Sequence, residues 1–129
     1  MLTVFAIQTA GAQTASAPQA AFLDGMQASV SKSIGAQDNT VEITLTDSVL
    51  TVLRVNSNQN ASSHAGRNNE ATSIAALASK AMSADAAVAA VHTIRVQYLN
   101  RDSAHPDGDV IDTVEFRKNA KGVFDAHIS

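Results

Sequence analysis

The sequence predicts an α+β fold: a two-layer sandwich with two helices on one face of a mostly antiparallel, four-stranded sheet. Two stretches carry apolar residues at the spacing of an amphipathic helix, and four others alternate apolar with polar residues as half-buried strands do. Strands with one polar side are typical of antiparallel sheets. The predicted order of elements is therefore α-β-β-α-β-β.

Size and charge limit what such a protein can be. The chain has 129 residues, of which 45% are hydrophobic and none is cysteine. That is the size of one domain, which we expect over residues 18–129. Lys and Arg number 9 against 12 Asp and Glu, for a formal net charge of −3. A nucleic-acid partner is disfavoured because its phosphates require a basic excess.

Residues 1–17 precede the predicted domain and carry no charged side chain. An apolar run from Leu2 to Ile7 leads to Ala10-Gly11-Ala12, which has small residues at the two positions that a signal peptidase requires. Ala15-Ser16-Ala17 fits less well, because Pro18 would follow the cut. We interpret the segment as signal-peptide-like, which points to a periplasmic or secreted bacterial protein. The alternative is a disordered tail on a cytoplasmic protein.

The first half of the domain reads as a helix and a hairpin. A helix is expected from Pro18, a good first-turn residue, to Ile34, where Gly35 can end it. Its apolar positions recur every fourth residue: Phe22, Met26, Val30 and Ile34. From Thr40 the period changes to two, and the turn Asp47-Ser48 separates this strand from a second one over Val49–Val55.

The second half reads as a loop, a helix and two more strands. Asn56–Asn69 is nearly all polar and is predicted to be a loop, with Asn68 or Asn69 capping a helix from Glu70 to Met82. Strands are expected over His92–Leu99 and Val110–Lys118. A short terminal strand within Val123–Ile128 is an additional candidate.

The solvent face of this sheet is the first candidate site. It would carry a polar set of mixed charge: Glu42, Thr44, Arg54, Arg95, Gln97, Thr113, Glu115 and Arg117. The candidate binding residues are Arg54, Arg95, Glu115 and Arg117. Arginine can hold an acidic group of a partner through two parallel hydrogen bonds. Ordinary cross-strand ion pairs on a wet sheet surface are the alternative interpretation.

The polar loop supplies the second candidate site. Asn56–Asn69 is longer than most connections, and such loops are either functional or disordered. His64 and Arg67 would lie at the mouth of the second helix, where free N–H groups and the helix dipole attract anions. An anion site and simple disorder are both left open.

Motifs of catalysis and metal binding are missing from the sequence. It contains no G-x-S-x-G, no H-E-x-x-H and no phosphate-binding glycine loop, and its four histidines lack ligand spacing. The loop Asn100–Asp109 is rich in Asp, but its spacing does not match a calcium loop, and Pro106-Asp107-Gly108 is a turn former. We predict no catalytic residue, metal or cofactor, while the sequence leaves the question of catalysis open.

The order of elements resembles BON-type modules of the bacterial envelope. The resemblance covers the hairpin Thr40–Val55, the helix Glu70–Met82 and the strand Val91–Leu99, with a helix like Pro18–Ile34 in front. The chain departs from the family at Asp47-Ser48 and Asn56-Ser57, where glycines are usual, and in its long polar loop and extra strand. The resemblance implies binding to an envelope partner or a membrane surface without catalysis.

These observations predict a small non-catalytic binding protein of the bacterial envelope or secreted fraction. It would act on a protein partner, or on itself, through the sheet face or a strand edge. The alternatives are a small-ligand carrier or enzyme with a pocket between helices and sheet, and a cytoplasmic accessory subunit.

Overall fold

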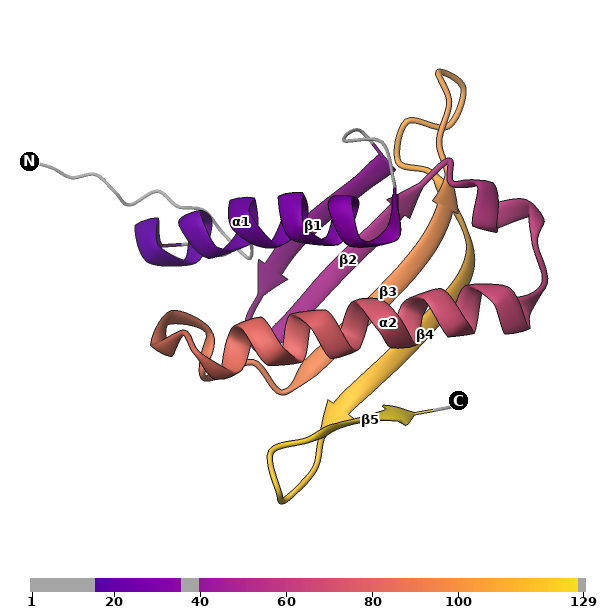
Figure 1. The fold of residues 1–129 in the computed structure, drawn as a ribbon. Coiled ribbons are helices and arrows are strands. Elements are labelled where there is room, and N and C mark those ends of the chain that lie inside the picture. The colour runs from indigo at the N-terminus through magenta and orange to yellow at the C-terminus, as the bar shows by residue number, and fades with distance from the viewer. Residues whose placement is uncertain (1–15, 36–39, 128–129) are drawn as a thin grey trace, which may run out of the picture.

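The computed structural model describes residues 16–35 and 40–127, and it confirms the α+β class (Figure 1). The signal-peptide-like residues 1–15 lie outside the described part. The elements are α1 (Ala17–Ile34), β1 (Val41–Thr46), β2 (Val49–Val55), the short 3-10 helix η3 (Asn58–Ala61), α2 (His64–Ser83), the 3-10 helix η4 (Ala86–Val88), β3 (Thr93–Asn100), β4 (Asp109–Lys118) and β5 (Phe124–His127).

The sheet differs from the predicted one in two respects. It has five strands in the order β1-β2-β3-β4-β5, because the terminal segment pairs with the end of β4. The central pair β2–β3 is parallel, whereas the other three pairs are antiparallel. The parallel pair arises because α2 carries the chain back to the end of the sheet where β2 began. The alternation of apolar and polar residues along a single strand does not reveal that crossover.

Both helices lie on the same face of the sheet, as the sequence predicts (Figure 1). Between the two layers lies the apolar core, to which Val30 of α1, Ile74 of α2, and the strand residues Leu50 and Val96 contribute. All four are at most 1% exposed. We call this side of the sheet the helix-facing side and the opposite side, which carries no described helix, the outer face.

Helix α1 agrees closely with its sequence prediction. Ser16 is the N-cap: its side chain accepts a hydrogen bond from the Gln19 amide, and the Gln19 side chain bonds back to the Ser16 amide. This is a capping box, which satisfies two otherwise unpaired donors. At the other end Gly35 adopts φ 69°, a left-handed conformation that glycine reaches at little cost.

Helix α2 begins six residues earlier than the predicted Glu70, at His64. Ser63, and not Asn68 or Asn69, is its N-cap, with its hydroxyl accepting from the Gly66 amide at 3.1 Å. The predicted loop 56–69 therefore contains η3 and the first turns of α2. Among the described residues, no helix is long and apolar enough to cross a membrane.

Candidate functional site

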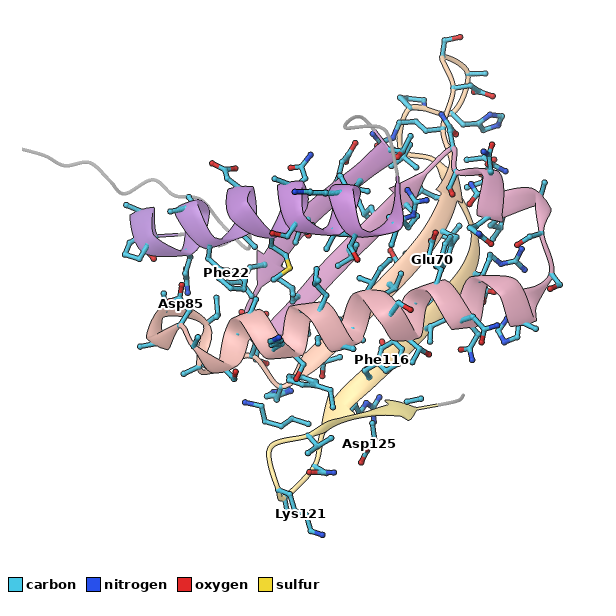
Figure 2. The ribbon with its side chains drawn as sticks, viewed as in Figure 1. Phe22, Glu70, Asp85, Phe116, Lys121 and Asp125 are labelled. Carbon is cyan, nitrogen blue, oxygen red and sulfur yellow. The ribbon has the colours of Figure 1, made fainter. Side chains whose placement is uncertain are left out.

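On each of three adjacent strands, a row of buried apolar residues is followed by one polar residue. These three polar residues lie at the same end of the sheet. On the helix-facing side Arg54 of β2 lies beside Tyr98 of β3, which lies beside Asp112 of β4. Helix α2 passes above them and presents His64, Arg67 and Glu70 at a spacing of three residues. We call these six residues the polar network, and Figure 2 labels its Glu70.

Arg54 uses all of its hydrogen-bond donors inside this network. Its Nε and one terminal nitrogen bind the Glu70 carboxylate at 2.9 and 3.3 Å. The remaining donors reach the Thr40 carbonyl and hydroxyl at 3.2 and 3.1 Å and the Ser57 hydroxyl at 2.7 Å. A guanidinium has five N–H groups, and five acceptors surround this one. Arg54 therefore holds β2 to α2 and has no donor to spare for a ligand.

This placement corrects the sequence analysis, which put Arg54 on the outer face. The residue is in phase with Leu50 and Val52, both fully buried, so its side chain emerges on the helix-facing side and is only 5% exposed. A hollow of about 320 Å³ lies beside Arg54 and Glu70. Because those two charges already neutralise each other, the hollow offers little to attract an ion.

Tyr98 joins the network at the centre of the sheet. Its hydroxyl lies 2.9 Å from Oε1 of Glu70 and 3.0 Å from the carbonyl oxygen of Arg67. Burial and then the negative charge of Glu70 raise the pKa of the Tyr98 hydroxyl far above its ordinary value. Tyr98 is therefore a neutral structural donor here and is unsuited to act as an acid or base near neutral pH.

His64 and Arg67, the predicted anion site, come together around a carboxylate of the chain itself. Oδ2 of Asp112 accepts from Nε of Arg67 at 2.8 Å and lies 2.7 Å from Nδ1 of His64. Burial alone would raise the pKa of Asp112, but the hydrogen bonds from Arg67 and His64 outweigh it and lower that pKa. Arg67 also binds the Ser62 carbonyl at 2.6 Å. Asp112 thus fills the place in which the sequence analysis put an external anion.

The outer face presents a different arrangement, built around Glu115 of β4. Its Oε2 accepts from Nε of Arg95 at 2.8 Å, and its Oε1 accepts from a terminal nitrogen of Arg117 at 3.3 Å. Arg95 and Glu115 are register partners on neighbouring strands, which is why the predicted group assembles. The hydrogen bond from Arg95 is the main reason why the pKa of Glu115 is lowered.

Around this carboxylate lies an open hollow of about 430 Å³, which we call the outer hollow. Its lining is Val49, His92, Thr93, Arg95, Glu115, Arg117 and Lys118. Two arginines and a histidine thus lie around one carboxylate, whereas the ammonium of Lys118 lies 5.5 Å from the centroid of the Phe124 ring. Among the described residues, each of the two arginines makes its only side-chain hydrogen bond to Glu115. Their other N–H groups are available to an acidic ligand.

His92, which lines the outer hollow, makes the only serine–histidine contact in the described part of the chain. Nε2 of His92 lies 2.6 Å from the Ser48 hydroxyl. The other ring nitrogen faces the Thr93 hydroxyl at 3.2 Å, where a catalytic histidine would have a carboxylate. No group of three His, Asp or Glu side chains that could hold a metal ion occurs within the described residues.

Sequence analysis missed Glu70, Tyr98 and Asp112 as members of one network, and His92 and Lys118 as lining of the outer hollow. A signal for the network does exist in the sequence: Arg54, Tyr98 and Asp112 each extend a row of alternating apolar residues. Only the strand register, which the pattern does not give, places them side by side.

Comparisons with known proteins were made by family model, by sequence and by structure. No family model, curated protein or solved structure matches this chain. The resemblance to BON-type modules therefore stays a prediction, and a function has to be argued from the site itself.

Proposed function

We propose that this chain is a small binding protein that takes an acidic group of a protein partner in the outer hollow. The observation that carries the proposal is the unequal pairing of charges there: Arg95 and Arg117 share the single carboxylate of Glu115. Planar guanidinium groups match a carboxylate through two parallel hydrogen bonds. A partner carboxylate would use the donors that Glu115 leaves unpaired.

A local acidic group suits this surface better than a long polyanion does. The chain as a whole has a formal net charge of −3, so a nucleic acid would be repelled outside the outer hollow. The side chains of Arg95 and Arg117 are 35% and 57% exposed, so a ligand can reach them without rearrangement of the sheet.

A ligand pocket between helices and sheet has less support. A shared cavity of His92, Tyr98 and Asp112 would favour it, but His92 lines the outer hollow while Tyr98 bonds to Glu70 beneath α2. The space between the layers is occupied by the apolar core. The binding proposal therefore concerns the outer face.

The test is a titration with an acetylated tetra-aspartate peptide, followed by NMR of the backbone amides. We expect chemical-shift changes confined to the start of β3 and the end of β4, around Arg95 and Glu115. These changes should become smaller as salt is added, because salt screens the attraction between the charges. The double variant Arg95→Gln/Arg117→Gln should bind at least about tenfold more weakly, since hydrogen bonds to charged groups contribute about 1.5–3 kcal/mol each.

The matched control is Lys32→Gln/Lys121→Gln, which changes the net charge equally but away from the outer hollow. Lys32 is on α1, and Lys121 lies in the β4–β5 turn, where Figure 2 shows it at the tip. This variant should bind the peptide as the wild type does. The proposal would be contradicted if the wild type does not bind the peptide at low salt. Equally weakened peptide binding in both double variants would also contradict it.

Export to the periplasm or beyond is the second part of the proposal. Its support is the uncharged segment 1–17, in which Ala10-Gly11-Ala12 follows the apolar run. Cleavage there would leave Ser16 in place to cap α1, whereas cleavage after Ala17 would remove the capping box. We expect the intact mass from the native host to correspond to a chain that starts at Gln13. A species that starts at Met1 in the cytoplasm would argue for an accessory subunit instead.

A further inference from the structure

Strand β1 forms one edge of the sheet, and part of its backbone points away from the sheet. The Asn56 amide donates to the Leu99 carbonyl at 2.9 Å, so the even-numbered residues of β2 direct their backbone groups toward β3. Because backbone groups alternate between the two sides of a strand, the odd-numbered residues of β2 bond to the even-numbered residues of β1. The N–H and C=O groups of Ile43 and Leu45 therefore point outward from the edge.

The third odd-numbered residue of this strand, Val41, has a partner for its carbonyl. Gln27 of α1 donates from Nε2 to that oxygen at 2.8 Å. Within residues 16–35 and 40–127, no side chain makes such a bond to the backbone of Ile43 or Leu45. The edge thus presents two donors and two acceptors at the spacing of a β-strand.

The opposite side of the sheet is protected against an added strand. There β5 is four residues long and covers only residues 115–118 of β4. Beyond β5, the outward Thr113 amide donates to Oδ1 of Asp112 at 2.9 Å, and Ile111 is an extra residue that makes a β-bulge. Short edge strands and bulges are devices that prevent strand addition. In contrast, β1 pairs without a bulge over six residues and contains neither Pro nor Lys.

The side chains of β1 differ between its two faces. Ile43 and Leu45 are half-buried and pack against the core on the helix-facing side. Thr44 and Thr46 are exposed on the outer face. The side chains of directly paired residues lie on the same face of a sheet. The segment that fits this edge therefore alternates aliphatic residues on the helix-facing side with polar residues on the outer face.

The position of α1 argues against a second copy of this chain at the edge. Helix α1 packs over β1, and its N-terminal part extends beyond this edge (Figure 1). Two β1 strands joined by a two-fold axis would lie about 4.8 Å apart, with both α1 helices above them. Packed helices need about 8–10 Å between their axes. A single extended segment has no helix of its own and meets no such obstacle.

We propose that β1 binds an extended segment of a partner protein, which joins the five-stranded sheet as a further strand antiparallel to β1. Backbone hydrogen bonds to Ile43 and Leu45 hold the segment, and its aliphatic side chains pack on the side that α1 covers. Main-chain bonds supply affinity in this mode of recognition, and alternate side chains supply specificity. The site is distinct from the outer hollow, whose lining comes from β2, β3 and β4.

The probe is the peptide acetyl-TKVTVKT-amide in two N-methylated forms of equal charge. When its valines lie opposite Ile43 and Leu45, their N–H groups point toward β1, whereas those of its lysines point away. The form methylated on both lysines should therefore bind. The form methylated on both valines should bind at least about tenfold more weakly, because two backbone hydrogen bonds are lost.

Hydrogen exchange measured by NMR locates the added strand. In the free protein, the amides of Ile43 and Leu45 should exchange faster than those of Thr44 and Thr46, which bond to β2. When the lysine-methylated peptide occupies about nine-tenths of the protein, exchange at Ile43 and Leu45 should slow about tenfold. Docking on another surface would not produce this alternating pattern.

Three results would overturn the proposal: equal binding of the two peptides, binding that leaves exchange at Ile43 and Leu45 unchanged, or no binding at about 1 mM peptide. Protection of these two amides in a dimer without peptide would identify a second copy as the occupant, and would overturn it as well. The variant Arg95→Gln/Arg117→Gln should bind the lysine-methylated peptide as the wild type does. Failure of this site therefore leaves the outer hollow untouched, and the reverse also holds.

Discussion

Two groups of arginines on opposite sides of one sheet differ in how fully they are paired. Arg54, on the helix-facing side, gives its five donors to Glu70, Thr40 and Ser57 and is 5% exposed. Arg95 and Arg117, on the outer face, share one carboxylate and are far more exposed. The same residue type therefore fastens the two layers together on one side and offers free donors on the other.

The difference shows that pairing separates structural charges from ligand-binding charges in this chain. A buried charge has to be fully paired, because desolvation without compensation costs several kcal/mol. An exposed charge keeps water as a partner and can exchange it for a ligand. We therefore expect substitutions on the helix-facing side to change stability, and substitutions on the outer face to change binding.

The strongest test of this comparison measures the single variants Arg54→Met and Arg117→Met against each other. Loss of Arg54 leaves the 11%-exposed Glu70 carboxylate without its counter-charge, so the free energy of unfolding should fall by about 3–5 kcal/mol. Loss of Arg117 should change it by less than about 0.5 kcal/mol. Urea denaturation followed by circular dichroism measures both. Equal losses in the two variants would mean that the pairing difference has no energetic meaning.

A smaller effect is expected for Tyr98→Phe. It removes a hydrogen bond to the Glu70 carboxylate and should cost roughly 2 kcal/mol. The raised pKa of Tyr98 adds a pH dependence. Its contribution to stability is complete below the unfolded pKa of about 10 and is lost as the pH rises through the higher folded value.

Tyrosinate absorbance measures this directly, since Tyr98 is the only tyrosine and the chain has no tryptophan. The signal should appear only as the protein unfolds at alkaline pH. Ionisation near pH 10, with the circular dichroism unchanged, would show instead that the hydroxyl is not held in the network.

A feature of this fold can be predicted from the sequence when its cause lies in residues that are neighbours along the chain. The helix start around Pro18, the end at Gly35 and the turn Asp47-Ser48 follow from neighbouring residues, and all three agree with the structure. The start of α2 does not follow from neighbouring residues. Residues 64–69 lack apolar periodicity, and Arg67 pairs with Asp112, which is 45 positions away on a strand. The pairing of β2 with β3 likewise depends on the crossover and not on either strand alone.

The candidate site likewise has a part that the sequence predicts and a part that it does not predict. Arg95, Glu115 and Arg117 could be predicted together because β3 and β4 alternate cleanly, so their outward residues are unambiguous. Arg54 was predicted on the wrong side, because β2 carries aliphatic residues on both faces, with Leu50 on one and Leu53 on the other. Residues on a strand with aliphatic side chains on both faces can be placed only when the register with the neighbouring strands is known.

The smallest expected difference compares the two carboxylates, with Asp112→Asn on the helix-facing side and Glu115→Gln on the outer face. Asp112 is 12% exposed and pairs with Arg67, so its loss should cost about 1 kcal/mol at neutral pH. Glu115 is 22% exposed, and its loss should cost about 0.5 kcal/mol or less.

The pH dependence of these two variants sharpens the comparison. Both carboxyl pKa values are lowered in the fold, so each contribution is present above the unfolded pKa of about 4 and is lost as the pH falls through the folded value. Stability measured from pH 7 downward should therefore converge with that of the wild type in both variants. Because Glu115→Gln also leaves Arg95 and Arg117 without their shared carboxylate, it should tighten tetra-aspartate binding, whereas Asp112→Asn should leave that binding unchanged. Weaker binding by Glu115→Gln would mean that Glu115 orients the arginines more than it competes for them.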